Sequence, residues 1–142
     1  MFGNLSLFEG SHNAEKPFSF NGGPFVKKLE RDWSKYYKIK NSISFNSATS
    51  CLFASIGALN IGYGDEVIFA SHTYIATAGA IKFVGAVPVP ADCREDHMID
   101  PVSIESLITE KTKAIIPTQL NGRCCEMDSL LDIANKHNLV II

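Results

Sequence analysis

The sequence has no long apolar run and no block of like charges, and each absence excludes a class of protein. No apolar run approaches the length that crosses a bilayer, and the first residues lack the basic and apolar regions of a signal peptide. A net charge of -2 leaves no basic patch that could attract nucleic acid or an anionic membrane. We therefore expect neither nucleic acid nor a membrane as a partner.

Metal-binding and disulfide patterns are absent as well. The four cysteines show no Cys-x-x-Cys spacing and have no paired histidines nearby; they are Cys51, Cys93, Cys124 and Cys125. We therefore expect no metal site and no disulfide, and reduced thiols indicate a cytoplasmic protein. A chain of 142 residues with 46% hydrophobic and 20% charged residues is typical of one globular domain with a single core.

The chain does contain a run of small polar residues between two apolar segments. Alternation over Ser42–Phe45 predicts a short strand, and Ser47 is a preferred helix N-cap. Apolar spacing predicts a helix from Ala48 that Gly62 and Gly64 end before the next strand. A helix that starts after a strand offers free N–H groups and a positive dipole end, which together favour a phosphate. An ordinary capped helix with small residues for packing remains the alternative.

Strands and helices are predicted to alternate along the rest of the chain. Helices are expected after Pro24, after Tyr74 as far as Gly85, after Asp100, and up to residue 137. Strands are expected at 67–69, 86–89, 114–117 and 139–142. With Ser42–Phe45 these make five, and the order predicts a three-layer α/β/α fold with a mostly parallel sheet.

Strand composition refines this picture of the sheet. Pro88 lacks a ladder donor and predicts an edge strand, whereas Ala114–Ile116 and Leu139–Ile142 are apolar enough for burial on both faces. Ligands in such sheets lie beyond the carboxyl ends of the strands, where Ser47–Ser50 and Ser71–Tyr74 are both expected.

The two ends of the chain are unusual. Residues 1–23 mix Gly, Ser, Asn and Phe without periodicity, which predicts an N-terminal arm lying against another surface, such as a partner subunit. The chain stops inside the apolar run Leu139–Ile142. A terminal carboxylate at a buried strand would need solvation, so we expect residues 24–142 to be the N-terminal part of a longer domain.

Seven short motifs occur in the order seen in one enzyme family. They include Ser47-Ala48-Thr49-Ser50-Cys51-Leu52, Gly64-Asp65-Glu66-Val67-Ile68, Thr73-Tyr74-Ile75-Ala76-Thr77, Gly85-Ala86-Val87-Pro88-Val89 and Leu120-Asn121-Gly122. From about Gly22 to Ile142 the chain resembles the DegT/StrS family of sugar-nucleotide aminotransferases, which use pyridoxal phosphate (PLP) and have the aspartate-aminotransferase type of fold. The resemblance implies that the chain is part of the large, PLP-binding domain.

The resemblance also assigns residues to a cofactor site. Ala48, Thr49 and Ser50 resemble the helix-start residues that hold the PLP phosphate, although the family commonly has Gly in place of Ala48 and Ala in place of Ser50. Backbone N–H donation survives both changes. Tyr74 resembles the aromatic residue that stacks on the pyridine ring; without the family it would be read as a core aromatic at a helix start.

No catalytic residue is assigned in this chain. The family's Asp, which pairs with the pyridine nitrogen, and its Lys, which binds PLP covalently, both come after the segment corresponding to Leu139–Ile142. The resemblance implies a homodimer that moves an amino group from an amino acid, glutamate, to a nucleotide-linked keto sugar for polysaccharide or glycoconjugate biosynthesis. We expect the chain alone to be inactive.

Two other functions remain open at this point. A sugar dehydratase or deoxygenase of the same family would differ at the missing lysine. A Rossmann-type nucleotide-binding domain is suggested by Gly62-Tyr63-Gly64, but these glycines precede a strand rather than follow one, and Val67 stands where the third glycine belongs.

Overall fold

The computed structural model describes residues 22–142, which fall into two compact units that meet between Asn46 and Ser47. The predicted arm lies almost entirely outside the described residues. It therefore stays a prediction, as does the division of the chain into residues 1–23 and 24–142. Within the described part, no helix combines the length and the apolar character that crossing a membrane requires.

The first unit is built around helix α1, Pro24–Tyr37. Pro24 opens the helix, as predicted, and Lys38 ends it in a left-handed conformation (φ 54°) with its N–H bonded to the Ser34 carbonyl. None of the residues of α1 is buried, and one side of the helix is strongly apolar. The exposed apolar side chains of this helix are those of Phe25, Leu29, Trp33, Tyr36 and Tyr37.

The strand predicted at Ser42–Phe45 is absent, and that prediction is wrong. Ile43 is 75% exposed, and among residues 22–46 no strand lies beside it to pair with its backbone. The carboxylate of Glu30 on α1 instead accepts hydrogen bonds from the Ser44 N–H (2.8 Å) and hydroxyl (2.9 Å). Alternating polar and apolar residues form a strand only where a neighbouring strand completes the ladder.

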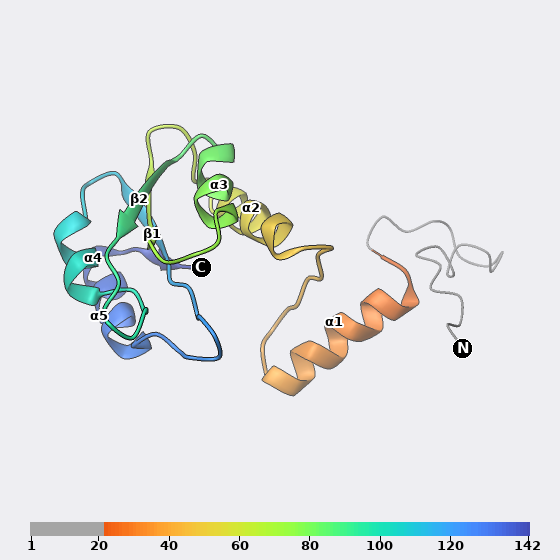
Figure 1. The fold of residues 1–142 in the computed structure, drawn as a ribbon. Coiled ribbons are helices and arrows are strands. Elements are labelled where there is room, and N and C mark those ends of the chain that lie inside the picture. The colour runs from red at the N-terminus through yellow and green to blue at the C-terminus, as the bar shows by residue number, and fades with distance from the viewer. Residues whose placement is uncertain (1–21) are drawn as a thin grey trace. The chain divides into compact units, whose positions relative to one another are not determined.

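The second unit is a parallel sheet covered by helices on both faces, which confirms the predicted fold class (Figure 1). Its four strands lie in the order β2-β1-β3-β4 and all run parallel. The strands are β1 (Glu66–Ala70), β2 (Val87–Ala91), β3 (Thr112–Ile116) and β4 (Val140–Ile141). The helices are α2 (Ala48–Ala58), α3 (Ala76–Phe83), α4 (Pro101–Leu107) and α5 (Met127–His137).

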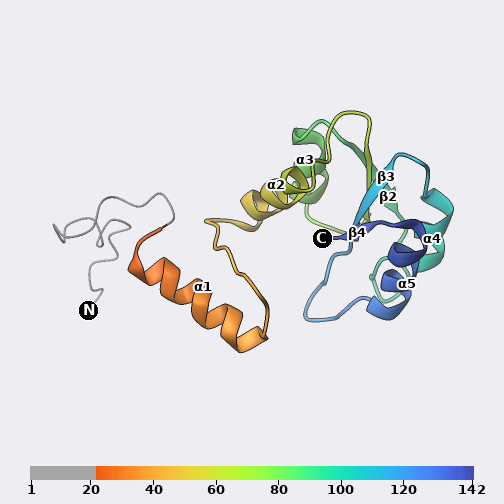
Figure 2. The same cartoon turned by 180° about the vertical axis from the view of Figure 1, so that it is seen from behind.

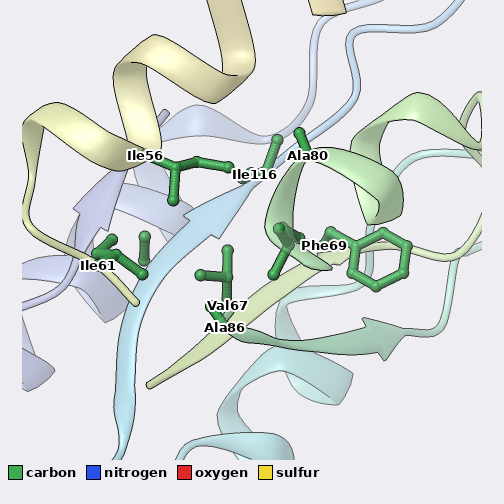
Figure 3. Close-up of a cluster of buried hydrophobic side chains, with 9 residues drawn as sticks. Ile56, Ile61, Val67, Phe69, Ala80, Ala86 and Ile116 are labelled. Atoms are coloured by element: carbon green, nitrogen blue, oxygen red, sulfur yellow. The ribbon is translucent and has the colours of Figure 1, made fainter. Parts of the chain in front are cut away.

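Alternate residues of the strands form two separate apolar cores, one on each face of the sheet, in place of the single core that was predicted. On one face, Val67 and Phe69 of β1 pack with Ile56 of α2 and Ala80 of α3 (Figure 3). On the other face, Ile68 packs among residues that include Ile104 of α4 and Leu130 of α5. Seen from behind in Figure 2, α2 and α3 again lie together, and α4 and α5 lie together on the opposite side of the sheet. This is the three-layer arrangement that the sequence predicts.

The edge strands are partly as predicted. β2 with Pro88 is an edge strand, and β3 is buried along Ala114–Ile116. β4 is not buried on both faces, because Val140 is 41% exposed and β4 pairs only with β3 in the described part of the chain. Burial of Leu139–Ile142 on both faces is therefore a wrong prediction.

The predicted helix ends are mostly confirmed. Gly85 stops α3 with a positive φ of 87°, and a Cβ there would meet the Tyr63 backbone nitrogen at 3.6 Å. α2 ends earlier than predicted, at Ala58, since Asn60 already adopts a left-handed conformation before Gly62 and Gly64 are reached.

Candidate functional site

The starts of α2 and α3 lie toward the same edge of the sheet. α2 ends shortly before β1 begins, and a tight turn joins them, with the Asp65 N–H donating to the Gly62 carbonyl (3.1 Å). α2 therefore ends near the edge where β1 begins, and its start points toward the edge where the strands end. α3 begins at that edge, a few residues after β1, and packs against α2. This is the edge at which ligands bind in parallel sheets.

In the described part of the chain, two backbone donors at the start of α2 have no hydrogen-bond partner. The Ser47 hydroxyl accepts from the Ser50 N–H (3.1 Å), as predicted for a cap, and the Ser47 carbonyl accepts from the Cys51 N–H (3.1 Å). Within residues 22–142 no hydrogen bond is found for the N–H groups of Ala48 and Thr49. The first turn also carries no acidic residue. Free donors at the positive end of a helix dipole suit an anion.

Tyr74 occupies the loop between β1 and α3, and 78% of its surface is exposed. The alternative of a core aromatic is therefore wrong. Its carbonyl accepts the Thr77 N–H at 3.0 Å, which ties its backbone to the first turn of α3. An exposed aromatic ring offers a flat apolar face to a ligand, and its hydroxyl lies at the far end.

Sequence reasoning missed a chain of three threonine hydroxyls at this edge. The Thr118 hydroxyl donates to the Thr73 hydroxyl (2.9 Å), which is also hydrogen-bonded to the Thr77 hydroxyl (2.9 Å). Thr73 follows β1 and Thr118 follows β3. These strands are neighbours in the sheet although 45 residues separate the two threonines. The only signal in the sequence is a threonine soon after each strand, which says nothing of strand order.

The histidines and cysteines near this edge form no metal site. The rings of His72 and His97 meet edge to face with centroids 5.1 Å apart, and the Ser71 hydroxyl lies 3.6 Å from the Cys93 sulfur. No group of three or more metal-ligating side chains occurs in the part of the chain that the structure describes. All four cysteines are free thiols, and burial raises the pKa of the Cys125 thiol.

The lysines of the second unit lie away from the strand ends where α2 and α3 start. Lys111 and Lys113 lie at the start of β3, which is the opposite edge of the sheet, and Lys82 is exposed near the end of α3. Lys136, at the end of α5, donates to the Glu105 carboxylate. None of these amines is placed to reach a ligand held at the start of α2.

Comparison with known proteins identifies the family. Residues 12–142 match the DegT/DnrJ/EryC1/StrS aminotransferase family. The chain belongs to this family. This match confirms the resemblance seen in the sequence motifs. It also removes the Rossmann-type alternative, because all of the described residues, 22–142, lie within the match.

Named relatives and solved structures of aminotransferases resemble the chain over most of its length. It is 40% identical to a GDP-perosamine synthase of Caulobacter vibrioides over 121 residues, 84% of this chain and 33% of that protein. It is 39% identical to a dTDP-3-amino-3,4,6-trideoxy-alpha-D-glucose transaminase of Streptomyces venezuelae, over 84% of this chain and 32% of the relative. The putative sugar aminotransferase Spr1654 of Streptococcus pneumoniae, in its PMP form, superposes with a TM-score of 0.78 at 42% identity, over 80% of this chain and 29% of the other.

Only part of each relative is represented. The chain spans about a third of the length of the curated relatives that it matches. The fold, the family and the sugar-aminotransferase character of the relatives are thus shown. The activity of the whole protein is an inference from them.

Proposed function

We propose that this chain is part of the cofactor-holding domain of a sugar aminotransferase, which moves an amino group from glutamate to a keto sugar linked to a nucleotide. The family match over residues 12–142 supports this proposal. The two relatives named above, a perosamine synthase and an amino-sugar transaminase, favour amino transfer over dehydration or deoxygenation of the sugar. Biosynthesis of a polysaccharide or glycoconjugate is the setting that we infer.

The main support for the proposal is the arrangement of hydrogen-bond donors at the start of α2. PLP has a phosphate group, and the N–H groups of Ala48 and Thr49, which have no partner among residues 22–142, fit one of its oxygens each. The Thr49 hydroxyl adds a donor at the same end of the helix, and the Ser50 hydroxyl, which is hydrogen-bonded to the Ser47 hydroxyl (3.0 Å), lies beside it. The first turn holds no carboxylate that would repel the phosphate.

Tyr74 fits the other part of the cofactor. Its exposed ring lies in the loop that leads into α3, whose start shares an edge of the sheet with the start of α2. We propose that this ring stacks on the pyridine ring of PLP and that the stacking adds about 0.5–1.5 kcal/mol beyond simple burial. When bound, PLP supplies the electron sink of the reaction, while these residues hold and orient it.

Within residues 47–142, no lysine is a candidate for covalent attachment of the cofactor. Lys82, Lys111, Lys113 and Lys136 all lie away from the start of α2, as described above. We therefore propose that the 142 residues bind PLP noncovalently and catalyse no amino transfer by themselves.

Two further properties are part of the proposal. A homodimer is supported by the family and by the exposed apolar side of α1, which includes Phe25 and Trp33. A cytoplasmic location is supported by the four free thiols.

A substitution that adds charge without weakening the helix tests the phosphate site. Ala48→Asp places a carboxylate in the first turn of α2, where the helix dipole favours it. A like charge about 4 Å from the phosphate costs on the order of 1–4 kcal/mol near a protein surface, so PLP affinity is expected to fall roughly tenfold or more. Affinity is measured by titration with PLP and with pyridoxal, which lacks the phosphate.

The control makes the same charge change at another helix. Val102→Asp adds a carboxylate to the first turn of α4, where Val102 is exposed, and is expected to leave PLP affinity unchanged. Pyridoxal affinity is expected to be the same in both variants and the wild type. Equal PLP affinity in the wild type and Ala48→Asp would show that the phosphate binds elsewhere.

A further inference from the structure

The position of the Tyr74 ring depends on its backbone, because few side chains of the described residues contact the ring. The ring is largely exposed, and within residues 22–142 no aromatic ring contacts it. Two points fix the backbone around it. The Tyr74 carbonyl accepts the Thr77 N–H, and the side chain of the preceding residue, Thr73, is hydrogen-bonded on two sides.

One of those two bonds comes from a different strand. Thr77 is a buried residue in the first turn of α3. Because it follows Thr73 by only four residues, the hydrogen bond between them is local. Thr118 lies beyond β3, and its hydroxyl reaches across to Thr73. The bond from Thr118 is therefore the one that ties the Tyr74 loop to the neighbouring strand of the sheet.

Thr118 is itself held by the segment that leads into α5. The buried Cys125 thiol donates to the Thr118 carbonyl (3.5 Å), and the Cys125 N–H donates to the side-chain carbonyl of Gln119 (2.6 Å). Burial raises the pKa of the Cys125 thiol, so the thiol keeps the proton that it donates. Two hydrogen bonds from Cys125 thus hold the segment that carries the Thr118 hydroxyl.

We propose that Thr118 is a positioning residue for the cofactor site, and that its hydroxyl acts through Thr73 and Thr77 to fix the backbone that presents the Tyr74 ring. The inference rests on the proposed function, because it assumes that Tyr74 contacts PLP. It adds a residue from the β3 exit to a site otherwise formed by the starts of α2 and α3. Thr118 touches no cofactor atom in this account.

The test removes the hydroxyl and reads two independent signals. Thr118→Val keeps the side-chain shape and breaks the bond to Thr73. Hydrogen exchange of the Thr77 amide, which donates to the Tyr74 carbonyl, is expected to accelerate about three- to tenfold, the factor that one neutral hydrogen bond is worth. The dissociation constant for PLP is expected to rise by a similar factor.

Three further variants serve as controls for Thr118→Val. Thr118→Ser restores the hydroxyl and is expected to bring both signals within about twofold of the wild type. Thr109→Val removes a hydroxyl that donates to Glu66 at the opposite edge of the sheet, and is expected to change neither signal. If Thr118→Val fails to fold, Thr73→Val breaks the same hydroxyl chain and is measured against Thr73→Ser.

The failure of the inference can be told from the failure of the proposed function. Unchanged exchange of the Thr77 amide in Thr118→Val overturns the inference, and so does an equal change in Thr109→Val. If Tyr74→Ala weakens PLP binding but Thr118→Val leaves it unchanged, the role of Thr118 is overturned and the proposed contact between Tyr74 and PLP stands. If Tyr74→Ala also leaves the affinity unchanged, the ring contact of the proposed function fails and the inference fails with it.

Discussion

Ser47 both caps α2 and leaves its start open to an anion. Its side chain accepts from the Ser50 N–H and its carbonyl accepts from the Cys51 N–H, which leaves the N–H groups of Ala48 and Thr49 without a partner among residues 22–142. A cap of this kind is worth about 1 kcal/mol to the helix. One residue thus stabilises the helix and determines which donors are available to a phosphate.

The role of Tyr74 is testable at the level of a single ring. Tyr74→Ala is expected to raise the PLP dissociation constant about two- to tenfold, because the stacking term of about 0.5–1.5 kcal/mol is lost. The matched control is Tyr63→Ala, since Tyr63 is 99% exposed and lies in the loop between α2 and β1, at the opposite edge. Equal affinities in the two variants, measured by PLP titration, would mean that Tyr74 does not contact the cofactor.

At the scale of single residues, the sequence predicts those features that only a few consecutive residues determine. The cap at Ser47 and the cap at Asp100 need only a few consecutive residues, and both are confirmed. Exposure of Tyr74 is not local, because it depends on what covers the loop. The bond between Thr118 and Thr73 depends on β3 lying beside β1, which no short motif encodes.

At the scale of helices and strands, the periodic segments were predictable and the margins were not. α5 and β3 carry strong apolar patterns, and both form where the sequence places them. Ser42–Phe45 has the alternation of a strand but no neighbour to complete a ladder, so it packs back on α1 through Glu30. Secondary structure that depends on a partner element cannot be read from its own residues alone.

The contact between α4 and α5 predicts a pH dependence of stability. Hydrogen bonds from Lys136 and then from His137 (2.9 Å) hold the pKa of Glu105 below its ordinary value of 4.5. A carboxyl whose pKa is lowered by folding stabilises the protein above its unfolded pKa, and this stabilisation is lost as the pH falls through the folded pKa.

Glu105→Gln isolates this contribution. The wild type is expected to exceed Glu105→Gln in free energy of unfolding near neutral pH, and the difference is expected to shrink as the pH falls below about 4.5. Urea unfolding at a series of pH values measures it. Glu110→Gln, at an exposed residue for which the described part of the chain offers no hydrogen bond, serves as control. A difference that stays constant from about pH 7 to about pH 3 would contradict the predicted linkage.

At the scale of the whole molecule, the described residues combine a covered sheet with a helix whose apolar side chains are exposed. In the second unit, each apolar core lies between one face of the sheet and a pair of helices. α1 has no buried residue, although the rings of Trp33 and Tyr37 contact each other at a tilt of 45° with centroids 4.8 Å apart. An exposed apolar face of this kind marks a surface that another element or molecule covers.

We expect that a second copy of the protein covers this face in a homodimer. Trp33→Asp is expected to convert the dimer to a monomer in sedimentation velocity, because a charge would be buried in an apolar contact. Arg31→Asp, on the charged side of the same helix, is expected to leave the dimer intact. A wild type that sediments as a monomer at all concentrations would contradict the expectation.

The central claim is that the start of α2 holds the phosphate of PLP. Amide NMR shifts during a PLP titration test it most directly, since Ala48 and Thr49 carry the free N–H groups. We predict that these two amides shift together and saturate with PLP, and that pyridoxal shifts them far less. Saturating PLP shifts elsewhere in the chain, with Ala48 and Thr49 unmoved, would contradict the account.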